Sequence, residues 1–140
     1  MEFRGTDETI HHTDNCIFCK IAKGEISSYK IYEDDLVFVF LDNSPDYNGH
    51  MLIIPKKHIV DTKDLMQEQG LLEHMIMIAE KMRELIKNTI GTEGFTYLWN
   101  MDNAQNVKHF HMHVIPRDKT LKIQPNILPV KDVYNQYFSR

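Results

Sequence analysis

The sequence lacks any apolar run that approaches the roughly 20 residues needed for a membrane-spanning helix. It also lacks the basic segment followed by an apolar stretch that marks an N-terminal export signal. Its basic residues do not gather in a stripe and the net charge is −4, so the charge pattern does not favour duplex nucleic acid as a partner. These absences predict a cytoplasmic protein that binds neither membrane nor nucleic acid.

Cysteine is almost absent, and the two that occur, Cys16 and Cys19, form a C-x-x-C pair. In a reducing compartment such a pair suits a metal site or redox chemistry better than a structural disulfide. A disulfide, or a pair without an ion, is the alternative interpretation. The spacing alone does not decide among these readings.

The composition is that of one folded domain with polar ends. Apolar residues make up 42% and charged residues 26% of the 140 residues, which is typical of a globular protein with a single core. Residues 1–14 follow neither a helix period nor a strand period and are predicted to form a flexible leader. The adjacent His11 and His12 in this leader are interpreted as solvated side chains. The domain itself is expected to span residues 15–118.

The apolar pattern predicts five strands and two helices. The strands are expected at residues 29–33, 36–41, 50–55, 95–100 and 107–115. A short helix is expected at residues 16–23 with Asn15 as its cap, and a long helix from Leu71 to a stop at Gly91. Consecutive strands have short links and the helices stand apart from them. The fold class is therefore expected to be α+β with an antiparallel sheet.

Two segments outside these elements carry weaker signals. Asp64 and Gln67 resemble a capping box for a separate helical turn, which Gly70 divides from the long helix. Beyond Pro116 the periodicity fades, so residues 119–140 are predicted to be a C-terminal extension. The apolar residues of this extension indicate that it packs on another surface, for which a second subunit is one candidate.

Three histidines alternate with apolar residues near the end of the predicted domain. On a strand, His109, His111 and His113 would share one face, while Phe110 and Met112 would enter the core. Histidine has an unperturbed pKa of about 6.5, so such a row can attack as a nucleophile, donate protons and bind anions. Phosphate chemistry uses these three abilities. A metal-binding strand is the alternative, and the lack of an adjoining carboxylate counts against it.

Several polar residues lie at the ends of neighbouring strands. His50 opens the third strand, Asn100 ends the fourth, and Gln105 and Asn106 precede the histidines. Asn and Gln most often serve loops, so each of them is weak evidence by itself. The nearby histidines make them candidates for contacts with a ligand.

The run from His109 to Ile115 resembles the signature of the histidine-triad (HIT) family, in which three histidines alternate with apolar residues and two apolar residues follow. The resemblance spans roughly residues 15–118 and includes CIFCKI, YEDD, FLD, GHMLIIPKKHI and QNVKHFHMHVIPR, in the order of the Hint-like bacterial members. It implies a HIT-like fold with a five-stranded antiparallel sheet, one long helix and one short helix per subunit. It also implies a homodimer joined through the long helix and adjoining strands.

The same resemblance implies a hydrolase that cleaves a nucleotide conjugate at its α-phosphate, such as a purine nucleoside phosphoramidate or a dinucleoside polyphosphate. His111 is the implied nucleophile, and it forms a transient nucleotidyl-histidine that water then hydrolyses. His113 and His50 complete the implied catalytic set as contacts to the phosphate oxygens. The implied substrate-binding residues are Asn100, Gln105, Asn106, Asp42, Ile17, Phe18, Ile21 and Phe40.

The roles within that substrate-binding set differ. A carboxylate like Asp42 holds the ribose hydroxyls in the family, and Asn100 and Gln105 are polar partners of the phosphate. The four apolar residues would enclose the base, although ordinary core packing also explains them. Asn106 stands where many relatives have serine or threonine near the leaving group. Because its amide cannot relay a proton as a hydroxyl can, the choice of leaving group stays open.

The resemblance further implies a structural zinc ion bound by Cys16, Cys19, His58 and His109, a closed tetrahedral set of sulfur and nitrogen ligands. This assignment turns His109 toward the cysteines, although the strand pattern puts it on the face of the nucleophile. A bend, or the spacing of about 6.6 Å between alternate strand residues, would reconcile the two.

Two other functions are compatible with the sequence. One is nucleotidyl transfer to another acceptor, a branch of the family that usually has glutamine in place of the third histidine. Retention of His113 and the short chain favour hydrolysis instead. The other is a nucleotide-binding or scaffold protein with little catalytic role.

Overall fold

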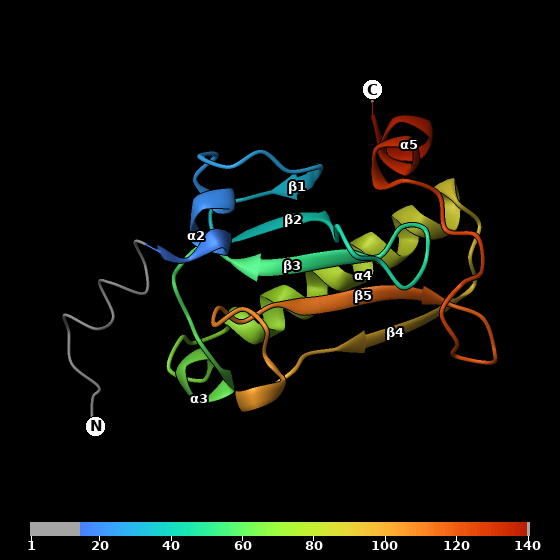
Figure 1. The fold of residues 1–140 in the computed structure, drawn as a ribbon. Coiled ribbons are helices and arrows are strands. Elements are labelled where there is room, and N and C mark those ends of the chain that lie inside the picture. The colour runs from blue at the N-terminus through green and yellow to red at the C-terminus, as the bar shows by residue number, and fades with distance from the viewer. Residues whose placement is uncertain (1–14, 140) are drawn as a thin grey trace.

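A single antiparallel sheet organises the protein. The computed structural model describes residues 15–139, so the predicted leader lies outside the described part of the chain. The strands are β1 (Lys30–Glu33), β2 (Val37–Leu41), β3 (Met51–Pro55), β4 (Gly94–Leu98) and β5 (Met112–Arg117). Their order in the sheet is β1-β2-β3-β5-β4, and every neighbouring pair is antiparallel (Figure 1). The predicted α+β class and five-stranded antiparallel sheet are confirmed.

Helices cover both faces of this sheet. They are α2 (Ile17–Ala22), α3 (Thr62–Leu65), α4 (Leu71–Thr89) and α5 (Val130–Val133), with a 3-10 turn at Asp102–Ala104 and a π-helical turn at Tyr134–Phe138. The long helix α4 lies across one face, and α2 lies at one end of the other face (Figure 1). None of the helices within residues 15–139 has the length and apolar character needed to cross a membrane.

The interior strand β2 shows how one sheet supports two cores. Val37, Val39 and Leu41 join the core on the α4 side, which we call the α4-side core. Phe38 and Phe40 point the other way into a smaller cluster with α2, the α2-side core. A strand covered on both faces needs apolar residues at every position. This explains the unbroken sequence VFVFL, all of which is buried.

The predicted hairpin and long helix are confirmed in detail. Between β1 and β2, Asp34 Oδ1 accepts hydrogen bonds from the backbone N–H groups of Leu36 (2.8 Å) and Val37 (2.9 Å), which closes the turn. Helix α4 starts directly after Gly70, whose φ of 79° lies in the left-handed region that favours glycine. The helix ends at Thr89, shortly before Gly91, as expected.

The predicted helix caps were wrong at two places. Cys16 caps α2, because its sulfur accepts the N–H of Cys19 at 3.4 Å; the cap was expected at Asn15. The turn at α3 is capped by Asp61, whose Oδ1 accepts the N–H of Asp64 at 3.0 Å. Asp64 therefore lies inside the turn rather than at its cap.

The last strand is shorter than predicted. Strand β5 begins at Met112, whereas the apolar pattern placed its start at residue 107. Pairing with β3 begins at Met112 opposite Ile53, and the N–H of Phe110 donates instead to the carbonyl of Ile59 at 2.6 Å. His109 and His111 therefore lie in the segment that leads into the sheet.

The C-terminal segment is more ordered than its sequence suggests. Helix α5 and the following π-helical turn occupy residues 130–138, where no helix was expected. Val133 is buried in the α4-side core, and the ring of Tyr134 lies 5.2 Å from that of Tyr29. The extension thus packs on its own chain. The helix is too short for its periodicity to be visible in the sequence.

Candidate functional site

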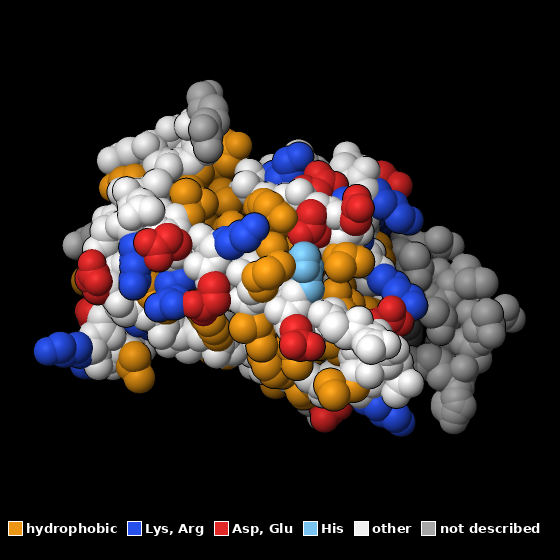
Figure 2. Space-filling view, turned by 180° about the vertical axis from the view of Figure 1, so that it is seen from behind, with side chains coloured by type: hydrophobic (Ala, Val, Ile, Leu, Met, Phe, Trp, Pro, Cys, Tyr) orange, Lys and Arg blue, Asp and Glu red, His pale blue; other side chains and the backbone are white. Residues whose placement is uncertain are grey.

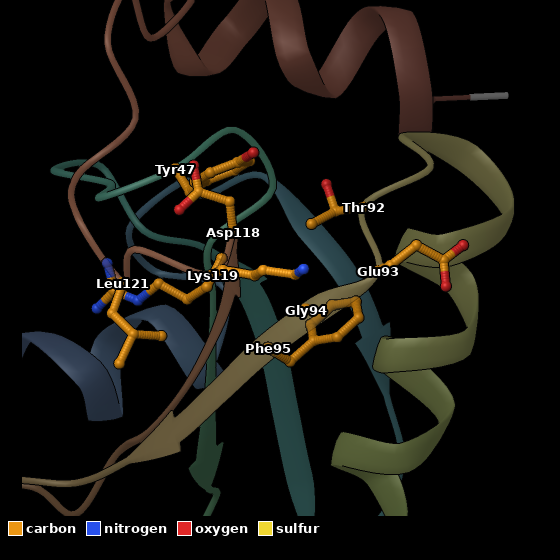
Figure 3. Close-up of a pocket in the computed structure, with 9 residues that line it drawn as sticks. Tyr47, Thr92, Glu93, Gly94, Phe95, Asp118, Lys119 and Leu121 are labelled. Carbon is orange, nitrogen blue, oxygen red and sulfur yellow. The ribbon is translucent and has the colours of Figure 1, made fainter.

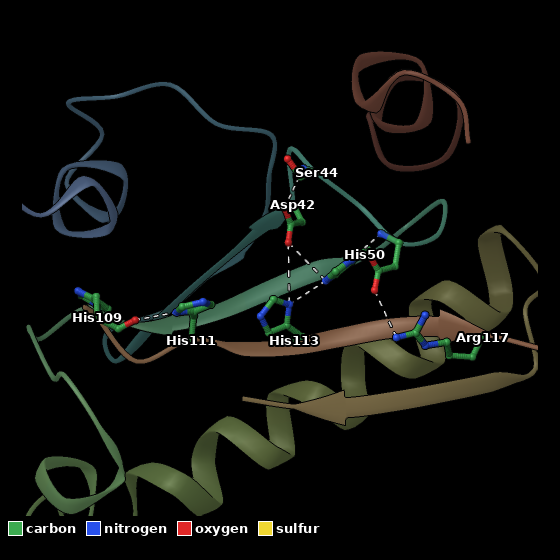
Figure 4. A network of polar contacts seen from close by, with 8 residues as sticks. Asp42, Ser44, His50, His109, His111, His113 and Arg117 are labelled. Carbon is green, nitrogen blue, oxygen red and sulfur yellow. Dashed lines mark hydrogen bonds and ion pairs between the residues drawn. The ribbon is translucent and has the colours of Figure 1, made fainter. Parts of the chain in front are cut away.

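The three histidines lie in a row on the α2 side of the sheet (Figure 4). The ring of Phe18 in α2 is 6.0 Å from that of His109 and 5.0 Å from that of His111. His113 pairs across the sheet with Leu52, a member of the α2-side core. Phe110, between the first two histidines, is fully buried in the α4-side core. The alternation expected of a strand is therefore kept, even though two of the histidines precede β5.

One end of this row meets the two cysteines. His109 Nδ1 lies 3.3 Å from Cys16 Sγ and 3.5 Å from Cys19 Sγ, and His58 Nδ1 lies 3.2 Å from Cys19 Sγ. We call these four residues the cysteine–histidine cluster. Because α2 itself lies on the histidine face, His109 can share that face and still reach the cysteines. The apparent conflict between the two predictions disappears.

The donor set of this cluster fits a tetrahedral metal ion. Its four ligand atoms all lie within 4.8 Å of one another. In a tetrahedral zinc site, neighbouring sulfur and nitrogen ligands are separated by about 3.6 Å, close to the distances found here. His109 Nε2 donates to the carbonyl of Pro55 at 2.8 Å, so its Nδ1 lone pair faces the cysteines. Burial and the neighbouring Cys16 raise the pKa of Cys19 to about 12, which means that the charged thiolate is unfavourable there. A bound dication would offset the free-energy cost of forming that thiolate.

The central histidine is held in one tautomer by the backbone. His111 Nδ1 lies 2.7 Å from the carbonyl oxygen of His109, which can only accept, so Nδ1 carries the hydrogen. The lone pair is then on Nε2. Burial lowers the pKa of His111 below its ordinary value, which keeps the ring neutral. A neutral imidazole with a free lone pair is the form that can act as a nucleophile.

His113 belongs to a second hydrogen-bonded chain, the histidine relay, which comprises Asp46, His50 and His113. The backbone N–H of Asp46 donates to His50 Nδ1 at 3.0 Å, so the hydrogen of the neutral His50 is on Nε2. His50 Nε2 donates to His113 Nδ1 at 2.9 Å and lies 3.4 Å from Asp42 Oδ2 (Figure 4). The hydrogen of His113 must then be on Nε2, which is buried and has no hydrogen-bond partner among residues 15–139. An unpaired buried donor is available to an anionic ligand.

Asp42, His50 and His113 also lie close enough together to be considered as metal ligands. The relay argues against this use. Because His50 Nδ1 already accepts the Asp46 N–H, a metal on Nε2 would require His50 to lose its last ring proton. These three residues are better described as a hydrogen-bond network.

Of the other polar residues predicted for the site, Asp42 lies with the histidines, through its contact with His50. Gln105, Asn100 and Asn106 form no hydrogen bond to the histidines within residues 15–139. The side chain of Gln105 is buried and its Nε2 donates to the carbonyl of Val60 at 2.7 Å, which holds the preceding loop. Asn100 and Asn106 are exposed.

Three of the four apolar residues predicted to line the site lie together. Phe18, Ile21 and Phe40 are buried members of the α2-side core, and the rings of Phe18 and Phe40 are 5.6 Å apart. Ile17 is 45% exposed and stands apart from that core. Phe38 and Leu52, which the sequence did not single out, belong to the same α2-side core.

Sequence reasoning also missed Asp46 and Pro55. Each acts through its backbone: Asp46 through an N–H that fixes His50, and Pro55 through a carbonyl that fixes His109. No side-chain pattern can reveal such a role, because every non-proline residue has the same donor and every residue the same acceptor.

One pocket near the sheet lies away from the histidines. It has a volume of about 550 Å³ and is lined by Tyr47, Phe95, Arg117 and Leu121 among others (Figure 3). It lies at the Arg117 end of β5, four positions or about 13 Å along the strand from His113. None of the triad histidines lines it.

The buried relay predicts that the fold is weakened by acid. Burial lowers the pKa of His113 to about 4, with the neighbouring His50 as a further cause. As the pH falls below about 6.5, the unfolded chain takes up this proton before the folded one, so stability falls until the pH approaches about 4. Urea unfolding should show a loss of about 2 kcal/mol from this group between about pH 7 and about pH 5. His113→Gln, whose amide oxygen can still accept from His50, should lose correspondingly less; an equal loss would contradict the assignment.

Known proteins resemble this chain in both sequence and fold. Protein hit from Bacillus subtilis is 40% identical over 110 residues, which cover 77% of this chain and 74% of that protein. Adenosine 5'-monophosphoramidase HNT1 from Candida albicans is 37% identical over 109 residues, or 74% of this chain and 70% of that protein. The crystal structure of a Zn-bound histidine triad family protein from Mycobacterium smegmatis superposes with a TM-score of 0.77 at 28% identity, over 89% of this chain and 91% of that one.

The family model of the HIT domain matches residues 23–120, a range that contains the histidine row, the relay and the whole sheet. Together with relatives that share 40% and 37% of their aligned residues, this match establishes the family. The protein belongs to the histidine-triad family.

Proposed function

We propose that this protein hydrolyses a nucleotide conjugate at its α-phosphate through a covalent nucleotidyl-histidine on His111. One observation carries the proposal. His111 Nε2 holds a lone pair beside the buried Nε2–H of His113, which has no partner in the described part of the chain, and the two rings are 5.2 Å apart. A nucleophile and a donor for a phosphoryl oxygen are the two groups that such a displacement needs. Relatives named adenosine 5'-monophosphoramidase support a nucleoside phosphoramidate as the substrate class.

The reaction proceeds in two displacements. His111 Nε2 attacks the α-phosphorus, the P–N bond to the amine breaks, and the amine leaves with a proton taken from solvent, which the attacking water of the second displacement returns. Water then attacks the nucleotidyl-histidine, which releases the nucleoside monophosphate and restores the neutral ring. In both steps the His113 N–H would donate to a phosphoryl oxygen as negative charge spreads over it.

The rest of the nucleotide would lie against the α2-side core. The ring of Phe18 lies beside His111 and packs against that of Phe40, and Ile17 is exposed at the start of the same helix, so we place the base here. We assign the ribose hydroxyls to Asp42, whose Oδ1 is anchored by the N–H of Ser44 at 2.8 Å. Gln105 contributes by holding its loop, and we assign the exposed Asn106 to the leaving group.

The direct test is turnover by the wild-type protein. Adenosine phosphoramidate should give AMP and ammonia, and an acid quench during turnover should yield a phosphorus–nitrogen adduct of AMP that peptide mapping places at His111. Presenting sugar phosphates or other acceptors distinguishes nucleotidyl transfer. Transfer to such an acceptor faster than to water would favour a transferase, and binding of AMP without turnover would favour a scaffold role.

We further propose that the cysteine–histidine cluster holds a structural zinc ion. When bound, zinc would cross-link α2, the segment after β3 and the segment before β5, and it would leave no ligand position open for substrate. The chemical steps therefore use the chain's own residues. Two reduced cysteines at such a site fit a reducing compartment, for which we propose the cytoplasm.

We also propose a homodimer joined through α4 and β4. Hydrophobic side chains gather on the α4 side of the molecule (Figure 2), where Ile76 and Met77 are 42% and 48% exposed. Strand β4 ends the sheet, so its outer edge has backbone groups open to a partner strand. Sedimentation equilibrium should return the mass of two chains, and the mass of one chain would contradict the proposal.

A further inference from the structure

We propose that Gln124 is a positioning residue, which sets the histidine relay by holding the loop of residues 42–50 from outside. The expected effect on catalysis rests on the proposed function. The expected effect on the His50 tautomer rests only on the hydrogen bonds of the loop. The loop carries Asp42, Asp46 and His50, the residues that orient His113.

The C-terminal segment crosses this loop and bonds to it at three points. Gln124 Oε1 accepts the backbone N–H of Asn48 at 2.8 Å, and the N–H of Gln124 donates to the carbonyl of Asp46 at 2.9 Å. The N–H of Leu128 donates to Asn48 Oδ1 at 3.0 Å. Gln124 therefore bonds to the loop with its side chain and its backbone together.

The bond to Asp46 lies next to the relay. Gln124 holds the carbonyl of Asp46, and the N–H of this same residue fixes the tautomer of His50. Arg117 Nη2 contacts the carboxylate of the same residue, at 3.3 Å from Asp46 Oδ2. Asp46 is thus held through its carbonyl and its carboxylate while its N–H is presented to His50.

Packing alone does not fix this part of the loop. Residues 43–48 are exposed or half-buried, in contrast to Gly49 and His50, which are buried. A Cβ atom on Gly49 would come within 2.6 Å of Ile90 Cδ1, so the end of the loop packs tightly against the rest of the protein. The middle of the loop has no such close packing. Hydrogen bonds must therefore supply the order that apolar contacts do not supply.

Loss of the Gln124 side-chain acceptor frees the Asn48 N–H, two residues after Asp46, while the backbone bond from residue 124 to the Asp46 carbonyl is kept. With one of its two anchors removed, the loop should move more freely, and the Asp46 N–H should loosen from His50. Without that donor, His50 can carry its hydrogen on either nitrogen, and only one of the two tautomers donates to His113. The fraction of molecules with a hydrogen on His113 Nε2 then falls. The effect should appear in the rate of the chemical step more than in nucleotide binding, because the α2-side core is unchanged.

The experiment compares Gln124→Leu with two matched variants. Gln124→Glu keeps an acceptor oxygen at the same position, and Gln136→Leu makes the same change at an exposed glutamine of the π-helical turn whose side chain makes no described hydrogen bond. Nitrogen-15 spectra of the histidine rings report the His50 tautomer, and kcat and KM are measured with adenosine phosphoramidate.

In Gln124→Leu we expect the His50 Nδ1 resonance to move from its acceptor position toward the average of two tautomers. We expect kcat to fall about 10-fold with KM within about two-fold, because small misplacement of a catalytic group is costly. Gln124→Glu should restore both readouts, and Gln136→Leu should match the wild type.

An unchanged His50 spectrum in Gln124→Leu overturns the inference, whatever the activity. Equal losses in Gln124→Leu and Gln136→Leu also overturn it, since they would indicate a general loosening of the C-terminal segment. If the wild type does not hydrolyse the substrate, the proposed function fails, and the spectra still decide whether Gln124 sets the relay.

Discussion

Replacing His111 with alanine should lower hydrolysis of adenosine phosphoramidate by at least about 10⁴-fold, while AMP binds within a few-fold of the wild-type affinity. The rate falls because the variant removes the Nε2 lone pair that attacks the phosphorus. Binding persists because the His113 donor and the rings of Phe18 and Phe40 stay in place. Steady-state kinetics and calorimetric titration with AMP measure the two effects separately.

A histidine outside the site provides the control. His74 lies on α4, where its Nε2 is 2.8 Å from Asp34 Oδ2. His74→Ala should retain wild-type turnover, because this pair takes no part in the histidine row. Turnover by His111→Ala close to that of His74→Ala would remove His111 as the nucleophile. A wild-type adduct mapped to another residue would do the same.

The sequence predicted those parts of the fold that depend on local patterns. The unbroken apolar strands, the acidic turn at Asp34 and the glycine stops around α4 were all visible as residue types at fixed spacings. The start of β5 was not, because an alternating pattern continues through His109 and Phe110 after the backbone has left the sheet. Alternation reports which way side chains face, and sheet pairing depends on a partner strand that is distant in sequence.

The site could be predicted only where it depends on the spacing of side chains or on the family resemblance. Histidines that share a face and cysteines one helical turn apart follow from spacing, and the family resemblance joined His58 and His109 to the cysteines. The tautomers could not be predicted, because they depend on the carbonyl of His109 and the N–H of Asp46. The contribution of the C-terminal segment was also missed, since Gln124 acts on a loop that lies 76 positions away from it in the chain.

Replacing Cys19 with serine should remove zinc from the protein and lower its melting temperature. The wild type is expected to hold about one zinc ion per chain, and the variant should hold little after dialysis. An ion that binds only the folded state stabilises it by about 4 kcal/mol when its concentration is about 1,000 times the dissociation constant. A loss of that size lowers the melting temperature by roughly 10–15 °C for a domain of this length. Metal analysis and thermal unfolding measure the two quantities.

A second ligand variant separates zinc loss from a local effect of the new serine. His58 is 39 positions from Cys19 in the sequence and meets it at the proposed ion site. His58→Ala should therefore lose zinc to the same extent as Cys19→Ser. His74→Ala should keep zinc. Retention of zinc by Cys19→Ser or by His58→Ala would contradict the four-residue ligand set.

Zinc loss should also change the tautomer of His111, because His109 contacts both the cysteines and His111. Its ring is a proposed metal ligand, and its carbonyl holds the hydrogen on His111 Nδ1. When the ring is released, that carbonyl is held less firmly, and His111 can exchange tautomers. The His111 ring should therefore show averaged nitrogen-15 resonances in Cys19→Ser while the His50 resonances stay unchanged, since Asp46 fixes His50 independently. Averaging at both rings would instead indicate that the fold as a whole depends on the ion.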